Sequence, residues 1–329
     1  MCREGACLEH EARYRVGEMF DLKVYGLILQ HGALLLFNDY LMNTGDISMK
    51  IGVSSYSFSA YRRESGCSYA DLCRIAKEIG FDAIEFIGLD AEDPIAEAGV
   101  IRAACAELGL EISAYTIGAN LMSEDFEATR AQLHRDLAIA KALGAPLMRH
   151  DVCYSLPEGT SWQDAVAVMA PRIREITEYA AGLGIQTCSE NHGYIFQDSE
   201  RVKALIDAVD HPNYRWLVDL GNFLCVDEDP LSAVKVAAPY AIHVHAKDFL
   251  YKIKSDAVAP TNFFGTRNGN YLRGTVVGHG VVPVDACMAI LKDAGYTGTL
   301  SLEFEGMEQN IPAIQSGYAY LRAVAERLA

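Results

Sequence analysis

Four short segments carry side chains that can bind a hard divalent metal ion. Each segment lies at the end of an apolar run, and the candidate ligands are Glu190 in QTCSENHG, Asp219 in RWLVDLGNF, His245 in IHVHAKD and Glu303 in TLSLEFEG. Three carboxylates with one imidazole favour Mn²⁺, with Mg²⁺, Co²⁺ and Zn²⁺ as alternatives, whereas a structural zinc site favours closely spaced thiolates. Because the segments are far apart in the chain, a single metal site requires a fold that brings them together.

Several candidate ligands have a neighbour two residues away that points to the same side of a strand and offers an alternative for the same role. The alternatives are Glu190 or His192, then His243, His245 or Lys247, and finally Glu303 or Glu305. Asp219 could instead cap a following helix. A metal site is favoured because hard ligands recur at successive strand ends in an apolar context, where an unpaired charge would be costly.

The elements that position these residues follow a repeat. A helical pattern ends in glycine and an apolar run follows at once, in KEIGFDAIEFI, AELGLEISAYT, KALGAPLMRHD, AGLGIQTCSEN and KDAGYTGTLSLEF. Glycine just beyond a helix adopts the left-handed conformation that ends it. The repeat therefore predicts alternating helices and strands.

Eight strands are expected, near residues 50–55, 81–87, 110–116, 146–151, 185–190, 214–219, 241–247 and 299–305. Several lack polar alternation, as is typical of a parallel sheet covered by helices. The sequence predicts a (β/α)₈ TIM barrel with a long insertion after strand seven. A doubly wound sheet is the alternative, but SSYSFSAYRRESG after the first strand lacks a glycine-rich dinucleotide turn. In a barrel, the candidate ligands fall at the carboxyl ends of the strands, where active sites lie.

Composition limits the class of protein. A chain of 329 residues with 50% hydrophobic residues can bury a large core. Its formal net charge of -16 opposes binding to nucleic acid or anionic membranes and favours a neutral substrate. The nine cysteines are scattered without CxxC spacing, which indicates reduced thiols and a cytoplasmic protein. The pattern predicts buried small side chains for Cys105, Cys188 and Cys287.

The first 48 residues differ from the rest and are predicted to be an N-terminal extension. Their apolar segment, residues 24–37, is too short to span a bilayer, and no signal-peptide pattern is evident. Met49 precedes the first strand-like segment, so the predicted organisation is an extension over 1–48 and a catalytic barrel over 49–329.

Further polar and aromatic residues are expected at the same barrel mouth, as candidates for binding substrate. They are Tyr115 on strand three, Arg149 and His150 on strand four, and Lys247 after strand seven. A structural salt bridge is the alternative for Arg149. The insertion, residues 249–280, contributes Phe263 and Arg273, because long barrel loops with aromatic residues usually cover a substrate or meet a partner.

The chain from Met49 onward resembles the xylose-isomerase-like superfamily of sugar phosphate isomerases and epimerases. KIGVSSYSF, SENHG, VDLGN, HVHAKD and GHGVVPVDACMAILKDAGYTGTLSLEFEG carry the resemblance. It implies a metal-dependent barrel with Glu190, Asp219, His245 and Glu303 as ligands. In isomerases and epimerases of this superfamily the metal-bound glutamates shuttle protons, which would make Glu190 and Glu303 catalytic.

A narrower resemblance is to the alpha subunits of bacterial C-glycoside deglycosidases, through LMRHD, the insertion, and His192 beside Glu190. It implies a carbon–carbon lyase acting on 3-keto C-glycosides, with His192 as the base at sugar C2. It also implies a small beta subunit in a hetero-oligomer and an oxidoreductase that supplies the substrate. Sugar isomerase or epimerase activity is the alternative, and His192 could instead be a hydrogen-bonded neighbour of the metal. A nuclease is disfavoured by the acidic charge, and a non-catalytic binding module would lack the metal.

Overall fold

The computed structural model describes residues 49–254 and 258–329. Its parallel strands form a closed barrel in the order β1-β11-β7-β6-β5-β4-β3-β2. The barrel strands are β1 (Lys50–Ser54), β2 (Ala83–Ile87), β3 (Glu111–Ile117), β4 (Leu147–His150), β5 (Gln186–Glu190), β6 (Tyr214–Asp219), β7 (Ala241–Ala246) and β11 (Thr299–Leu302). The predicted TIM barrel is confirmed. The predicted extension over residues 1–48 lies outside the described residues.

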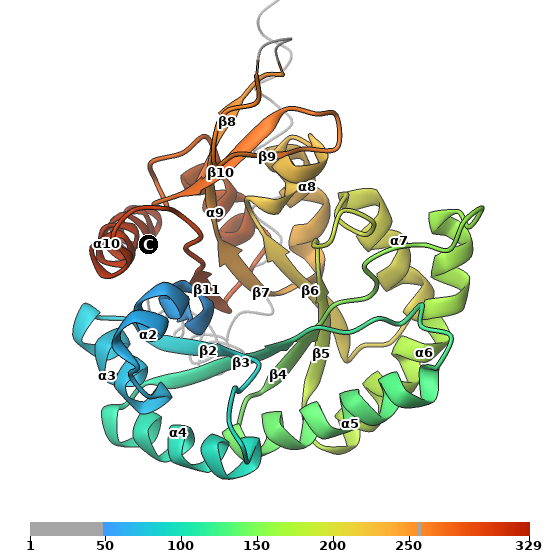
Figure 1. The fold of residues 1–329 in the computed structure, drawn as a ribbon, viewed down its shortest axis with the longest axis horizontal. Coiled ribbons are helices and arrows are strands. Elements are labelled where there is room, and N and C mark those ends of the chain that lie inside the picture. The colour runs from blue at the N-terminus through green and yellow to red at the C-terminus, as the bar shows by residue number, and fades with distance from the viewer. Residues whose placement is uncertain (1–48, 255–257) are drawn as a thin grey trace, which may run out of the picture. The chain divides into compact units, whose positions relative to one another are not determined.

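Helices cover the outside of the barrel (Figure 1). They are α2 (Ser59–Ser65), α3 (Tyr69–Ile79), α4 (Pro94–Leu108), α5 (Phe126–Leu143), α6 (Trp162–Gly182), α7 (Ser199–Val209), α8 (Pro230–Ala237), α9 (Val284–Asp293) and α10 (Asn310–Leu328), with short 3₁₀ helices η1 (Ser55–Phe58), η2 (Asn222–Val226) and η3 (Ala238–Tyr240). The glycines of the five predicted joints all have positive φ, from 60° at Gly109 to 115° at Gly80. This conformation lets each helix end and the next strand begin after only two to five residues.

Two apolar clusters hold the barrel together. The larger one fills the space between strands and helices. The smaller one lies inside the barrel and contains Ala114, Leu147, Cys188 and Leu217. Cys105, Cys188 and Cys287 are buried, as predicted. The inner cluster closes the barrel below the strand ends, so polar residues inside the barrel gather at the carboxyl end.

The insertion after β7 forms a sheet of its own with strand order β8-β10-β9, and this sheet extends away from the barrel (Figure 1). The strands are β8 (Asp248–Lys252), β9 (Phe264–Gly265) and β10 (Tyr271–Thr275). The two ends of the insertion are tied together by the Asp248 carboxylate, which accepts hydrogen bonds from the amides of Gly278, Gly280 and Val282 at 2.8 to 3.0 Å. Within the described part of the chain, no helix combines the length and hydropathy that crossing a membrane requires.

Candidate metal centre

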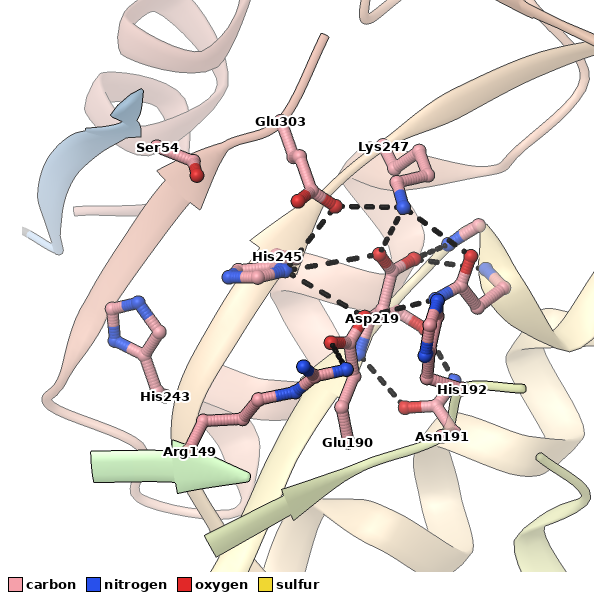
Figure 2. Close-up of polar contacts among 12 residues, drawn as sticks. Ser54, Arg149, Glu190, Asn191, His192, Asp219, His243, His245, Lys247 and Glu303 are labelled. Carbon is pink, nitrogen blue, oxygen red and sulfur yellow. Dashed lines mark hydrogen bonds and ion pairs between the residues drawn. The ribbon is translucent and has the colours of Figure 1, made fainter. Parts of the chain in front are cut away.

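The barrel brings Glu190, Asp219, His245 and Glu303 together at the carboxyl ends of four neighbouring strands (Figure 2). Each offers one ligand atom, and these atoms all lie within 4.8 Å of one another. His245 Nδ1 lies 3.4 Å from Glu303 Oε2, 3.7 Å from Glu190 Oε1 and 3.9 Å from Asp219 Oδ2. All four residues are buried. The cluster is therefore a compact carboxylate–histidine site within the protein.

Local hydrogen bonds fix the orientation of these ligands. Asp219 Oδ1 accepts from the amides of Gly221 and Asn222, both at 2.8 Å, which leaves Oδ2 facing the cluster. The Asn222 side chain also donates to Glu190 Oε1 at 2.9 Å. The Asn191 side chain accepts a hydrogen bond from the Asp219 amide at 2.9 Å and donates one to the Asp219 carbonyl at 2.8 Å. One oxygen of Asp219, Oδ1, thus caps the turn that begins η2, and the other, Oδ2, is directed to the cluster.

The charge of the cluster calls for a cation. Asp219 Oδ2, Glu303 Oε2 and His245 Nδ1 are buried without a hydrogen bond of normal geometry in the described part of the chain. Burial, together with the charges of Glu190 and Glu303, raises the pKa of Asp219 although Lys247 opposes this shift. Buried carboxylates are stable when paired with cations or bound to metal. The donor set and the unsatisfied atoms fit a hard divalent ion.

Two neighbours of the ligands take other roles. His243 turns to Glu85, with Nε2 at 2.5 Å from Oε2. Lys247, a predicted substrate-binding residue, is buried and forms ion pairs with Glu303 at 2.7 Å, Asp219 at 3.2 Å and Glu305 at 3.4 Å. The lysine therefore compensates part of the negative charge of the cluster, and its ammonium group points toward candidate ligands.

A second hydrogen-bonded group adjoins Glu190. The guanidinium of Arg149 lies 2.7 Å from both Glu190 Oε2 and Asp151 Oδ1, and His192 Nδ1 lies 2.9 Å from Asp151 Oδ1. Burial lowers the pKa of His192, but the hydrogen bond to Asp151 and the charge of Glu190 outweigh this and raise it above its ordinary value. The His192 side chain is 45% exposed, so its Nε2 is the nitrogen available to a substrate. Arg149 serves as a buried salt bridge, which was the alternative to substrate binding.

Tyr115 and His150 are not brought into the cluster, and their placement at the barrel mouth is corrected. Adjacent strand residues face opposite sides, so both face the helices while Thr116 and Arg149 face inward. Burial raises the pKa of Tyr115 to about 12, and Asp136 on α5 adds to this shift. His150 stacks on Tyr214, with ring centroids 6.1 Å apart.

The insertion is anchored over the loops that follow β5 and β6. Asp227 accepts from Thr266 Oγ1, the Asn268 amide and the Asn270 side chain, each at 2.8 Å, and Arg267 pairs with Asp198. Phe263 and Arg273, the two predicted substrate-binding residues here, contact each other, with the guanidinium carbon 5.5 Å from the ring centroid. Among the described residues, no hydrogen bond or ion pair joins either side chain to the metal cluster.

Sequence reasoning missed Glu85 and Tyr56. Glu85 is a fully buried carboxylate in the middle of the apolar strand DAIEFI, and that context was the available signal. Tyr56 follows β1, and its pKa is raised by burial and by Glu305, with Lys247 opposing. Its hydroxyl therefore lies near the mouth of the site, although its sequence context, SSYSF, gives no sign of this.

The fold and the site define a (β/α)₈ barrel with a carboxylate–histidine centre at the carboxyl ends of its strands. A family model described as xylose isomerase-like TIM barrel matches residues 73–324, and the chain belongs to this family.

Two relatives by sequence are enzymes. The chain is 25% identical over 209 residues to 3-oxo-isoapionate decarboxylase of Pectobacterium atrosepticum, covering 62% of this chain and 70% of the relative. It is 22% identical over 270 residues to L-ribulose-5-phosphate 3-epimerase UlaE of Salmonella paratyphi C, covering 76% and 87%. Relatives with similar sequences are thus named as a decarboxylase and an epimerase.

Solved structures show the same fold. A xylose isomerase domain protein from Planctomyces limnophilus superposes with a TM-score of 0.67 at 18% identity, over 85% of this chain and 98% of that chain. The apo form of 3-keto-D-glucoside 4-epimerase YcjR from E. coli gives 0.63 at 18% identity, over 84% and 99%. At such identities the likeness concerns the fold alone.

Proposed function

We propose that this chain is a divalent-metal-dependent lyase that cleaves 3-keto C-glycosides by removing the proton at sugar C2 and eliminating the aglycone. The observation that carries the proposal is the adjacency of two groups with different exposure. A buried set of four ligand atoms lies within 4.8 Å, and beside it the 45% exposed His192 is held by Asp151.

In this proposal, the positions of the side chains decide which residue removes the proton. When bound by Glu190, Asp219, His245 and Glu303, the divalent ion, for which the donor set favours Mn²⁺, acts as a Lewis acid that makes a proton next to a ketone easier to remove. His192 accepts the C2 proton on Nε2 while Asp151 holds Nδ1. The C2–H electrons become the C1=C2 bond as the bond from C1 to the aglycone breaks. The aglycone carbon takes up a proton from solvent, to which His192 returns its own, and the C3 ketone is unchanged in the product.

Epimerisation or isomerisation of a keto sugar is the second candidate. It begins with the same proton abstraction, and it would use Glu190 or Glu303 to return a proton to the substrate. The similarity to an epimerase over 76% of the chain supports it. The similarity to a decarboxylase of a 3-oxo compound supports bond cleavage beside a ketone.

Other parts of the proposal have different grounds. A small beta subunit in a hetero-oligomer and an oxidoreductase that supplies the 3-keto substrate come from the resemblance, and a cytoplasmic location comes from the scattered cysteines. The insertion would supply an aromatic wall for the aglycone through Phe263, next to Arg273.

The test is NMR of the Mn²⁺-loaded protein in D₂O, with a 3-keto C-glucoside of an aromatic aglycone and with the small subunit where one exists. Free aglycone establishes the lyase. Deuterium at C2 or an epimerised sugar, without aglycone release, establishes the second candidate and refutes the first. Metal-free protein is the control and should leave the substrate unchanged.

A further inference from the structure

A buried carboxylate reaches one of the candidate ligands from across the barrel. Glu85 lies on β2 and is fully buried, whereas His243 and His245 lie on β7, and β1 and β11 stand between these strands in the barrel. Glu85 Oε2 lies 2.5 Å from His243 Nε2, and Glu85 Oε1 lies 2.8 Å from His245 Nε2. Glu85 Oε1 and His245 Nε2 are both buried, and neither has a hydrogen bond of normal geometry in the described residues, so their 2.8 Å contact is an ion pair.

These three residues could be taken for a second metal site, because their ligand atoms also lie close together. The distances argue against this. A metal at about 2.0–2.2 Å from both a nitrogen and an oxygen keeps the two ligand atoms about 2.8 Å or more apart, even at a right angle. The 2.5 Å separation between His243 and Glu85 is shorter than this limit and fits a hydrogen bond. Glu85 therefore accepts a hydrogen bond from His243 with one oxygen and pairs with Nε2 of His245 through the other.

We propose that Glu85 is a positioning residue of the metal centre. It keeps a proton on Nε2 of His245, so that Nδ1 is the nitrogen presented to Glu190, Asp219 and Glu303. This inference rests on the proposed metal-dependent function and deepens it. A carboxylate that accepts from the far nitrogen of a metal-binding histidine fixes its tautomer and ring orientation and makes the ligand more basic.

His243 completes the arrangement by holding the other oxygen of Glu85. Its ring packs edge-on to that of His245, with centroids 5.6 Å apart and an interplanar angle of 79°. With both oxygens engaged, the carboxylate of Glu85 is fixed in rotation. The imidazole of His245 is thereby held between Glu85 on one side and three carboxylates on the other.

The first test uses the wild-type protein with ¹⁵N-labelled histidine. With Zn²⁺ as a diamagnetic probe, NMR should show His245 protonated at Nε2 and metal-bound at Nδ1. The opposite assignment, with the proton on Nδ1, would overturn the inference without any variant having to fold.

The second test compares Mn²⁺ affinity in Glu85→Gln and Ser301→Ala by competition with a chelating indicator. The glutamine amide has one acceptor oxygen for two histidines, and its NH₂ faces the other imidazole, so we expect the dissociation constant to rise about 10–100-fold. Ser301 is the matched control, because it is buried, lies in register with His245 on β11 and has a hydroxyl without a partner among the described residues. Its variant should bind Mn²⁺ as the wild type does.

The outcomes separate this inference from the proposed function. Wild-type affinity in Glu85→Gln, with His245 still protonated at Nε2, would refute the role of Glu85 and leave the metal-dependent reaction standing. A wild-type protein that binds neither Mn²⁺ nor Zn²⁺ would refute the proposed function and this inference with it.

Discussion

Metal binding at the cluster should stabilise the whole barrel, and Asp219→Asn should remove that effect. An ion that binds the native state alone adds about 4 kcal/mol of unfolding free energy at a free concentration of about 1,000 times its dissociation constant. The unfolding entropy is about 2.1 cal/mol/K per residue, or about 0.6 kcal/mol/K for roughly 280 ordered residues. Saturating Mn²⁺ should therefore raise the melting temperature by about 7 °C.

The variant should respond differently with and without metal. Asparagine keeps an acceptor for the amides of Gly221 and Asn222 but removes a charge next to Glu190 and Glu303. Burial first, and then these charges, raise the pKa of Asp219. Ionisation of Asp219 therefore does not change the unfolding free energy of the metal-free protein below the ordinary pKa of an aspartate. Above the raised pKa, it lowers that free energy by its full amount. Above that raised pKa, metal-free Asp219→Asn should be more stable than metal-free wild type, by about 1.4 kcal/mol for each tenfold decrease that folding causes in the acid dissociation constant of Asp219.

Scanning calorimetry with EDTA and with Mn²⁺ measures both effects. Asp285→Asn on α9 is the matched control, because its exposed pair with Arg327 should contribute less than about 1 kcal/mol. This control should keep the full response to metal. If Asp219→Asn also gained about 7 °C with Mn²⁺, the ion would bind elsewhere and the assignment of the cluster would be wrong.

Three other predictions concern the surroundings of the cluster. His192→Ala should lower kcat about 10²–10⁴-fold without loss of Mn²⁺ affinity, and retained C2 proton exchange would move the role of base to a glutamate. Lys247→Met leaves buried carboxylates unpaired, so denaturant unfolding should show a loss of about 3–5 kcal/mol in metal-free protein that Mn²⁺ largely restores; an unchanged midpoint would contradict the charge argument. Phe263→Ala should raise KM for aryl C-glycosides and not the melting temperature, and unchanged kinetics would exclude Phe263 from the aglycone site.

The barrel could be predicted because the signals that end its helices are local in the sequence. A glycine such as Gly80 ends its helix by its own backbone conformation, so the residues next to a boundary determine where the helix ends and the strand begins. The predicted end of the last strand was wrong, because β11 ends at Leu302 rather than at residue 305. The Glu303 amide still donates to Ala246, and the chain then leaves the sheet. The sheet of the insertion was not predicted, because its short strands pair with one another and carry no clear periodic pattern.

Site residues could be placed correctly from the sequence where the direction of their side chains along the strand was considered. Alternation along a strand was applied to Glu190 and His192 and to Glu303 and Glu305, and all four lie on the barrel's open side or at its rim. It was not applied to Arg149 and His150, which are adjacent and must face opposite ways. The position of Glu85 could not be derived in this way, since its partners come from a strand that is not its neighbour in the barrel.

The carboxylate–imidazole pairs His245–Glu85 and His192–Asp151 differ in burial, and burial gives the two histidines different capacities. His245 is fully buried, with Nε2 turned to Glu85 and Nδ1 turned to the three carboxylates, so neither nitrogen is left for a substrate. His192 has Nδ1 bound to Asp151 while 45% of its side chain is exposed. An imidazole with one nitrogen held and the other accessible can take up and release a proton. In the proposed reaction, the same pairing therefore suits His245 to bind the metal and His192 to exchange protons with the substrate.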